Sequence, residues 1–147
     1  MKPAVLLPLL LLALPASTQN RRVERAGQEL PIPITLPLIA SNLDTLGGRY
    51  VRVLDLRVER FVSPQAFVVG TADHDGTRAL VLLRHPAGSA LVEGVAVQVL
   101  GRAYTLAGAS AYEGWPPQLT RRAVAAFSGV PVIVADAVRA PGGVSLY

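Results

Sequence analysis

The stretch "RYVRVLDLRVER" constrains the fold more than any other part of the chain. A β-strand points successive side chains to opposite faces, so the apolar residues of a half-buried strand should all share one parity. The apolar residues of this stretch change parity partway along: Val51, Val53, Leu54, Leu56 and Val58. A straight strand would therefore place apolar side chains on both faces.

We expect a β-bulge near Val53 and Leu54 to remove this conflict. One extra residue would shift the inward positions from odd to even and turn the five apolar residues into one core-facing series. The alternative is that Leu54 and Leu56 face a partner protein. We favour the bulge, because a register shift would otherwise expose a whole apolar set. A first strand that bends between two sets of neighbours is typical of a small barrel.

Four more short strands follow, separated by turn-forming residues. Ser63-Pro64 and "ADHDGT" mark two of the turns, so the second and third strands should form a hairpin. In the fourth strand Val95, Val97 and Val99 should alternate inward. The five predicted strands span residues 50–60, 65–70, 78–85, 95–106 and 131–138. This spacing predicts an all-β sandwich or barrel.

The region between the fourth and fifth strands differs in composition. "AGASAYEGWPPQ" interrupts the strand pattern with small residues and prolines. "LTRRAVAAF" has a helical rhythm that places Leu119, Val124 and Phe127 inward, begins after Pro117 and should end at Gly129. We therefore expect a short helix before the last strand. The final "RAPGGVSLY" is typical of a loose tail.

The N-terminal "MKPAVLLPLLLLALPAST" has the layout of a secretory signal, with a positive charge at Lys2, an apolar run to Leu14 and small residues at its end. The run is about half as long as the roughly 20 apolar residues of a membrane helix, so we favour export over a retained membrane anchor. Cleavage should fall between Ala16 and Asn20. Contact with the membrane should then be transient, through the signal alone.

Residues 19–40 are polar and then rich in proline. Proline lacks a backbone donor and favours an extended path, so we expect a linker that lies against the domain rather than a central strand. Ser41 should cap a short helical turn, with Asp44 at the reciprocal position, and Gly47 and Gly48 should end it. The predicted organisation is a signal at 1–18, a linker at 19–40, a barrel domain at 41–140 and a tail at 141–147.

Composition excludes several classes of site. The chain has no cysteine, which rules out disulfides, a thiolate nucleophile and cysteine-ligated zinc. Loss of Lys2 with the signal leaves arginine as the source of positive charge, against 10 acidic residues. Most arginines alternate with acids, unlike the concentrated basic surface of a dedicated nucleic-acid binder.

The strand order resembles the OB-fold, and particularly the small exported bacterial OB-fold proteins related to anticodon-binding and single-strand-binding modules. The stretches that carry the resemblance are "GRYVRVLDLRVERFVSPQAFVV", "ALVLL", "GVAVQVLGRAY" and "SGVPVIVADAV". It implies a five-stranded Greek-key barrel, here with its helix-like insert before the fifth strand rather than between the third and fourth. It also implies a ligand face on the second and third strands and the loop before the fifth. These regions are residues 65–69, 78–84 and 109–118.

The candidate ligand-binding residues of that face are Phe67, Arg78, Arg84, Tyr104, Tyr112 and Trp115. An exposed Phe67 would stack on a base, and the two arginines would contact phosphates. The alternatives are a core position for Phe67 and solvated arginines at strand ends. Trp115, followed by two prolines, is suited either to gripping a sugar or peptide or to capping the barrel end.

Catalytic and metal-binding patterns are weak in this sequence. "DHDG" offers two carboxylates and His74, but four sequential turn residues wrap an ion poorly, and a solvated hairpin turn is the simpler interpretation. His85 lies at a strand end and has no identified nucleophile to activate. The sequence contains no phosphate-binding glycine loop and no G-x-S-x-G motif. We predict no catalytic residue, no metal site and no cofactor.

The sequence thus predicts an exported, monomeric and non-catalytic binding module that contacts a protein or an envelope polymer such as a glycan. Outside the cytoplasm these ligands are more available than RNA. The alternative is a protein that binds single-stranded nucleic acid, a function that the fold would carry with it.

Overall fold

The computed structural model describes residues 29–73, 75–113 and 121–147. The chain divides into two compact units, Met1–Leu30 and Pro31–Tyr147, and the second holds the strands and helices given below. The predicted signal, residues 1–18, lies outside the described residues, so export stays a prediction. In the part of the chain that the structure describes, no helix is long and apolar enough to cross a membrane.

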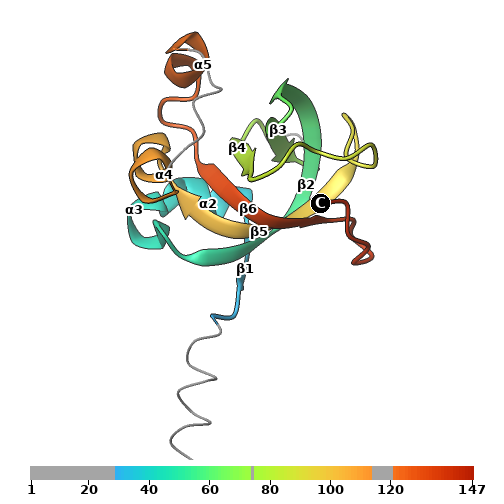
Figure 1. The fold of residues 1–147 in the computed structure, drawn as a ribbon. Coiled ribbons are helices and arrows are strands. Elements are labelled where there is room, and N and C mark those ends of the chain that lie inside the picture. The colour runs from blue at the N-terminus through green and yellow to red at the C-terminus, as the bar shows by residue number, and fades with distance from the viewer. Residues whose placement is uncertain (1–28, 74, 114–120) are drawn as a thin grey trace, which may run out of the picture. The chain divides into compact units, whose positions relative to one another are not determined.

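Five strands close into a barrel (Figure 1). Their order around the barrel is β2–β3–β4–β6–β5, and β5 pairs back onto β2. β4 and β6 are parallel, and the other neighbours within the barrel are antiparallel. The strands are β2 (Tyr50–Ser63), β3 (Ala66–Thr71), β4 (Arg78–Leu83), β5 (Ala96–Tyr104) and β6 (Val132–Arg139). The prediction of an all-β, OB-like Greek-key barrel is confirmed.

The predicted bulge in β2 is present. Val53 pairs with Val99 and Leu56 pairs with Val97, so β2 has one residue more than β5 over this interval. Asp55 takes up the extra length with a φ of 57°, in the left-handed region. Before the bulge β2 lies between β1 (Ile32–Thr35) and β5, and beyond it β2 also pairs with β3.

The bulge keeps one side of β2 in the barrel interior. Val51, Val53, Leu56 and Val58 are all buried, so the idea that Leu56 faces a partner protein is wrong. Leu54 was predicted to belong to the same series, but it is only partly buried and lies outside the core. It sits at the bulge, where its pairing partner is Thr35 of β1.

The barrel interior is aliphatic apart from Phe67, and we call it the inner core. Its buried members are Leu36, Ile39, Val51, Val53, Leu56, Val58, Phe67, Val69, Ala79, Val81, Leu83, Leu91, Val97, Val99, Ala103, Ile133, Ala135 and Val138. Val97 and Val99 face inward as predicted, and Val95 is partly buried against the same core. Residues 86–95 contain no helix, in agreement with the expected connection between β4 and β5.

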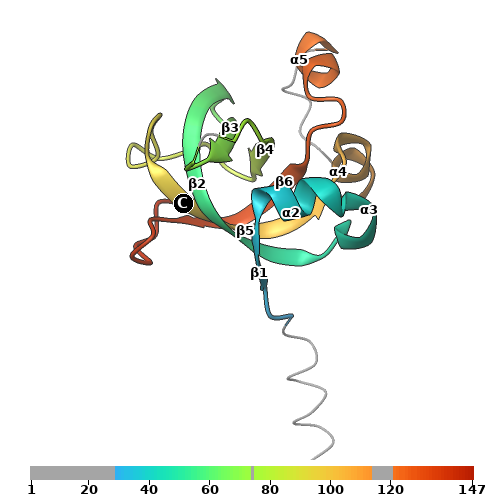
Figure 2. The same ribbon diagram turned by 180° about the vertical axis from the view of Figure 1, so that it is seen from behind.

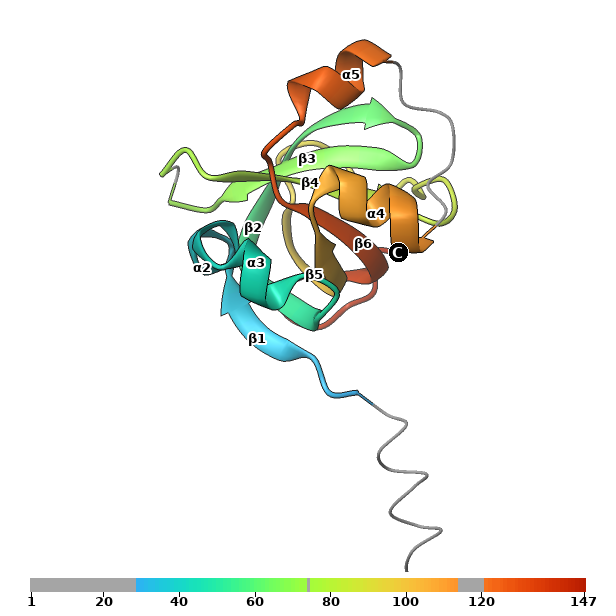
Figure 3. The ribbon, with the colours of Figure 1, turned by 90° about the vertical axis from the view of Figure 1, so that its left-hand side faces the viewer.

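In the described residues, two helices lie between β5 and β6 (Figure 3). α5 (Arg121–Ala126) is the predicted short helix, and Gly129 follows it with a φ of 81°. α4 (Leu106–Glu113) was not predicted, because its small residues were interpreted as an interruption. Phe127 is buried as expected; Leu119 lies outside the described residues, and the Val124 side chain is not described.

The predicted linker is in part a structured element. β1 pairs in parallel with β2, and α2 (Leu36–Ser41) follows directly (Figure 2). Leu36 and Ile39 are fully buried in the inner core. Residues from Pro31 onward therefore belong to the barrel unit, and the expectation of an extended linker reaching residue 40 is wrong.

The turn before β2 ends as predicted but begins differently. α3 (Leu43–Leu46) follows Asn42, and the Ser41 hydroxyl donates to the Pro37 carbonyl at 2.9 Å instead of capping α3. The Gly47 N–H donates to the Leu43 carbonyl and ends the helix. Gly48 has a φ of 79°, a conformation that glycine adopts readily.

The C-terminal segment is not loose. It turns back along the end of β6, where the Leu146 N–H donates to the Val138 carbonyl at 2.8 Å. Arg139 and Ser145 form an antiparallel bridge. Leu146 and Tyr147 pack against the inner core. The segment pairs with β6 beyond the residues that β4 covers, which explains its order.

Candidate functional site

The face predicted to bind a ligand is covered by the chain itself. The outward side chains of β3, β4 and the start of β6 form an apolar layer outside the barrel, which we call the outer cluster. Tyr104 before α4, Ala109 within α4 and Phe127 after α5 pack on it. Its buried members are Ala66, Val68, Leu80, Leu82, Tyr104, Ala109, Phe127, Val132 and Val134. α4 contacts β6 and closes this side of the barrel (Figure 3).

The structure separates the predicted ligand-binding residues. Phe67 is fully buried inside the barrel, with its ring centroid 5.4 Å from that of Phe61. Tyr104 is part of the outer cluster. Neither ring is available to stack on a base. The Tyr112 side chain and Trp115 lie outside what the structure describes.

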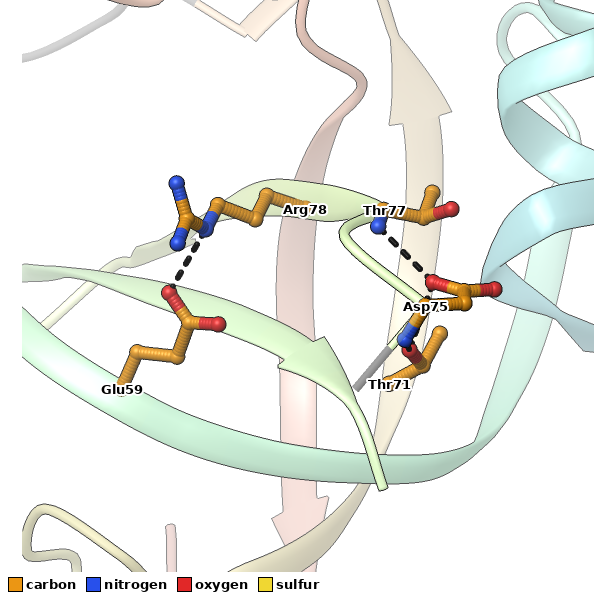
Figure 4. Close-up of polar contacts among 5 residues, drawn as sticks. All are labelled: Glu59, Thr71, Asp75, Thr77 and Arg78. Atoms are coloured by element: carbon orange, nitrogen blue, oxygen red, sulfur yellow. Dashed lines mark hydrogen bonds and ion pairs between the residues drawn. The ribbon is translucent and has the colours of Figure 1, made fainter. Parts of the chain in front are cut away.

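The two predicted arginines are exposed and ion-paired. Arg78 Nε lies 2.9 Å from a carboxylate oxygen of Glu59 (Figure 4). Arg84 lies 3.5 Å from the Asp136 carboxylate. These arginines therefore pair with acids on β2 and β6, and they do not form a joint site with Phe67.

The turn after β3 is fixed by Asp75 (Figure 4). Its carboxylate accepts from the Thr77 N–H at 2.8 Å and from the Thr71 hydroxyl at 2.7 Å. These hydrogen bonds favour the charged form and lower the pKa of Asp75. The residues that the structure describes contain no cluster suited to a metal ion, and His74 is not among them. The contacts of Asp75 are those of a hairpin turn.

The open side of the barrel is the outer face of β2, β5 and β6 (Figure 1). The inward residues include Val51 and Val53 on β2, Val97, Val99 and Ala103 on β5, and Val138 on β6, so the residues that alternate with them face outward. We call these outward residues the basic face. They are Tyr50, Arg52, Gln98, Leu100, Arg102, Ala137 and Arg139.

Strand pairing brings these residues together in rows. Tyr50 pairs with Arg102, and the Arg102 guanidinium carbon lies 5.9 Å from the centre of the Tyr50 ring. Leu100 pairs with Arg52 on one side and with Ala137 on the other. Gln98 pairs with Arg139. Three arginines from three strands thus share one surface.

The charge of the basic face is uniform. None of its residues is acidic. Arg52 and Arg139 are exposed and form no ion pair with any residue that the structure describes. The nearest acids are Asp136, which follows Ala135 on β6 and is paired with Arg84, and Asp44 on α3. The surface is therefore cationic, with one ion-paired acid and one exposed acid at its borders.

A depression of about 680 Å³ opens where the basic face meets α3 and α4. Arg102 forms part of its wall and donates to the Gly48 carbonyl at 2.8 Å. On another side Thr105 accepts from the Gly108 N–H at 3.0 Å and caps the start of α4. The lining residues are Leu43, Asp44, Gly47, Gly48, Arg102, Tyr104, Thr105 and Gly108. The volume is that of a small-molecule site, with polar groups on its walls.

No protein-family model, curated protein or solved structure matches the chain. The strand order and the exposed surfaces described above therefore define the candidate site.

Sequence reasoning missed the basic face for a physical reason. The strands that carry it are separated in the chain, and only the closure of β5 onto β2 and β6 places Arg52, Arg102 and Arg139 on one side. The signal was present as arginines at outward positions of "YVRV", "VQVLGR" and "AVR". Combining these positions required the pairing register, which the sequence does not state.

Proposed function

We propose that this protein is a non-catalytic binding module that acts outside the cytoplasm and contacts a protein or an envelope polymer through the basic face. The observation that carries the proposal is the contrast between the two sides of the barrel. The β3–β4 side is covered by the outer cluster, whereas the β2–β5–β6 side presents two exposed arginines and the partly exposed Tyr50, Gln98 and Arg102. A ligand can reach the second side without displacing any described part of the chain.

The layout of residues 1–18 supports a place outside the cytoplasm, since it matches a secretory signal. The shape of the basic face supports a macromolecular ligand. Its residues come from three adjacent strands, so the surface is extended rather than enclosed. The depression beside it would accommodate one projecting group of such a ligand.

Single-stranded nucleic acid is the weaker candidate. The arginines favour it, but binding of this kind also uses exposed aromatic side chains as stacking platforms. Phe67, Tyr104 and Phe127 are buried, and the ring of Tyr50 lies against Arg102. None of the aromatic side chains in the described residues is fully exposed.

The proposal is tested by mapping amide chemical shifts. The ¹⁵N-labelled protein is titrated separately with soluble envelope proteins and soluble envelope polymers. We expect one of them to shift amides of residues 50–52, 98–102 and 137–139, while those of 79–83 in the covered strand β4 stay unchanged. Shifts confined to β3 and β4, or no shifts on the basic face with either ligand class, would overturn the proposal.

A further inference from the structure

We infer that the ligand of the basic face is an acidic envelope polymer, in which negative charges repeat along a flexible sugar or polyol backbone. This inference rests on the proposed function and specifies its ligand. It follows from the charge of the face, the spacing of its arginines and the groups that accompany them.

The charge requires an anionic ligand. Two exposed arginines, Arg52 and Arg139, have no ion-pair partner among the described residues. Asp55 is the acid closest along β2, but it lines a separate depression with Thr35 and Asp73 on the other edge of the strand. Asp136 at one border of the basic face is paired with Arg84, and Asp44 lies at the other border beside Arg102, so the unpaired positive charge is concentrated at Arg52 and Arg139.

The spacing favours several anions on one chain over a single compact anion. Arg52 and Arg102 are diagonal neighbours on adjacent strands, which places their Cα atoms about 7 to 8 Å apart. Arg139 lies one strand beyond β5, in the row of Gln98. Its Cβ is therefore roughly 12 Å from that of Arg52, because strands lie about 4.8 Å apart and rows nearly 7 Å apart. A repeating polymer can place a separate anion at each arginine, whereas a single phosphate would have to draw three extended side chains together to contact them all.

The surface also positions its arginines. Leu100 is 6% exposed although it belongs to neither the inner core nor the outer cluster, so it is covered on the outer face. Its cross-strand neighbours there are Arg52 and Ala137. A long aliphatic stem such as that of Arg52 can cover an apolar cross-strand neighbour while its guanidinium stays at the surface. A guanidinium held in this way loses less freedom when it binds an anion.

The accompanying groups suit hydroxyls better than bases. Gln98 sits in the same row as Arg139 and offers amide donors and an acceptor to sugar or polyol hydroxyls. The Tyr50 ring, the sole aromatic of the basic face, already contacts Arg102. An acidic polymer needs charge and hydrogen bonds but no stacking, which matches what this surface provides.

The test compares charge-matched double variants. R52Q/R139Q removes two charges from the basic face, and R60Q/R122Q removes two exposed charges elsewhere. The probes are polygalacturonate, poly(glycerol phosphate), neutral dextran and oligothymidylate, and affinity is measured by calorimetry at two salt concentrations. Melting curves confirm that each variant folds, and R52K/R139K keeps the charge at the tested positions.

We expect one or both acidic polymers to bind and dextran not to bind. R52Q/R139Q should weaken binding about tenfold, since an exposed ionic contact contributes up to about fivefold, and R60Q/R122Q should change it less than about twofold. R52K/R139K should retain most of the affinity. Affinity should also fall about tenfold between about 50 and 200 mM salt. A preference between the polymers then assigns the anion as carboxylate or phosphate.

Three results would overturn the inference. Equal loss in both double variants would show attraction by overall charge, and tighter binding of oligothymidylate than of either polymer would identify nucleic acid as the ligand. No binding of either acidic polymer would also reject it. In that case amide shifts on the basic face with an envelope protein or a neutral polymer would leave the proposed function intact, whereas no shifts there would remove both.

Discussion

Asp55 determines the course of the first barrel strand. It is the one non-glycine residue with positive φ in the described part of the chain, and it provides the extra residue that keeps Val53 and Leu56 on the same side of β2. The parity change in the sequence was enough to predict a bulge near this position. It did not show which residue would take the left-handed conformation or that Leu54 would turn toward β1, because both depend on the neighbouring strands.

Substitutions at Asp55 should separate backbone conformation from side-chain contacts. The free energy of unfolding of D55G should lie within about 1 kcal/mol of that of the original protein, because glycine adopts positive φ without steric cost. D55V should lower the free energy of unfolding by about 1 to 3 kcal/mol, since a β-branched residue is strained at positive φ. Urea denaturation measures both. R57V, in the same strand with ordinary φ, is the control, and an equal loss in R57V and D55V would contradict the explanation.

At the scale of elements, the contact between β5 and β6 depends on Gly101. A Cβ atom at this position would overlap the carbonyl oxygen of Val134. The close approach coincides with a register shift in β6, where Leu100 pairs with Ala137 and Gly101 pairs with Ala135. The sequence identified both strands but not this approach, since a glycine within a strand is compatible with several local structures.

Gly101 and Gly70 form a matched pair for testing this contact. G101A should lower the free energy of unfolding by about 3 kcal/mol, because a backbone atom has to move. G70A should cost less than about 1 kcal/mol, since its Cβ would meet the flexible Glu59 side chain, which can swing away. Thermal and urea unfolding of both variants provide the measurement. Comparable losses of unfolding free energy in G101A and G70A would show that the close β5–β6 contact does not depend on glycine at position 101.

The helices show where local patterns were insufficient. α5 was recognised from the proline before it and the glycine after it, which are local signals. α4 consists largely of small residues with little amphipathic pattern, and it is identified by its contact with the barrel: Ala109 is fully buried in the outer cluster. The same contact covers the face that the resemblance had assigned to a ligand. The strand order alone did not indicate that a helix of the same chain covers this face.

At the scale of the whole molecule, the barrel unit begins earlier than its sequence suggested. Prolines in the segment before Ser41 indicated a linker, yet Leu36 and Ile39 fill part of the inner core. The composition of this segment is that of an extended tether, and its burial arises only because β2 offers an edge to β1. The C-terminal segment was misjudged for the same reason, because its order comes from pairing with β6.

Truncation tests this boundary. A chain that starts at Pro31 should unfold with the same free energy as the full chain within about 0.5 kcal/mol, because the barrel unit, with its strands, helices and cores, begins at Pro31. A chain that starts at Leu43 should lose about 3 to 6 kcal/mol, the amount expected for exposing the sites of Leu36 and Ile39. Denaturation curves of the three chains provide the comparison. Equal stability of the two truncated chains would show that β1 and α2 do not stabilise the barrel and act only as a linker.

β1 also has a consequence for how copies of this protein behave at high concentration. It borders the sheet and contains Pro33, and Pro31 directly precedes it; as prolines, neither residue supplies an N–H group. In an edge strand, proline is found where its nitrogen faces away from the neighbouring strand, so the outer edge of the strand lacks N–H donors. A strand from another molecule could donate hydrogen bonds to the carbonyls of this edge, but the edge has too few N–H groups to complete a β-ladder with it. Such a border resists fibril growth, which suits a protein expected to persist beyond the reach of cytoplasmic chaperones.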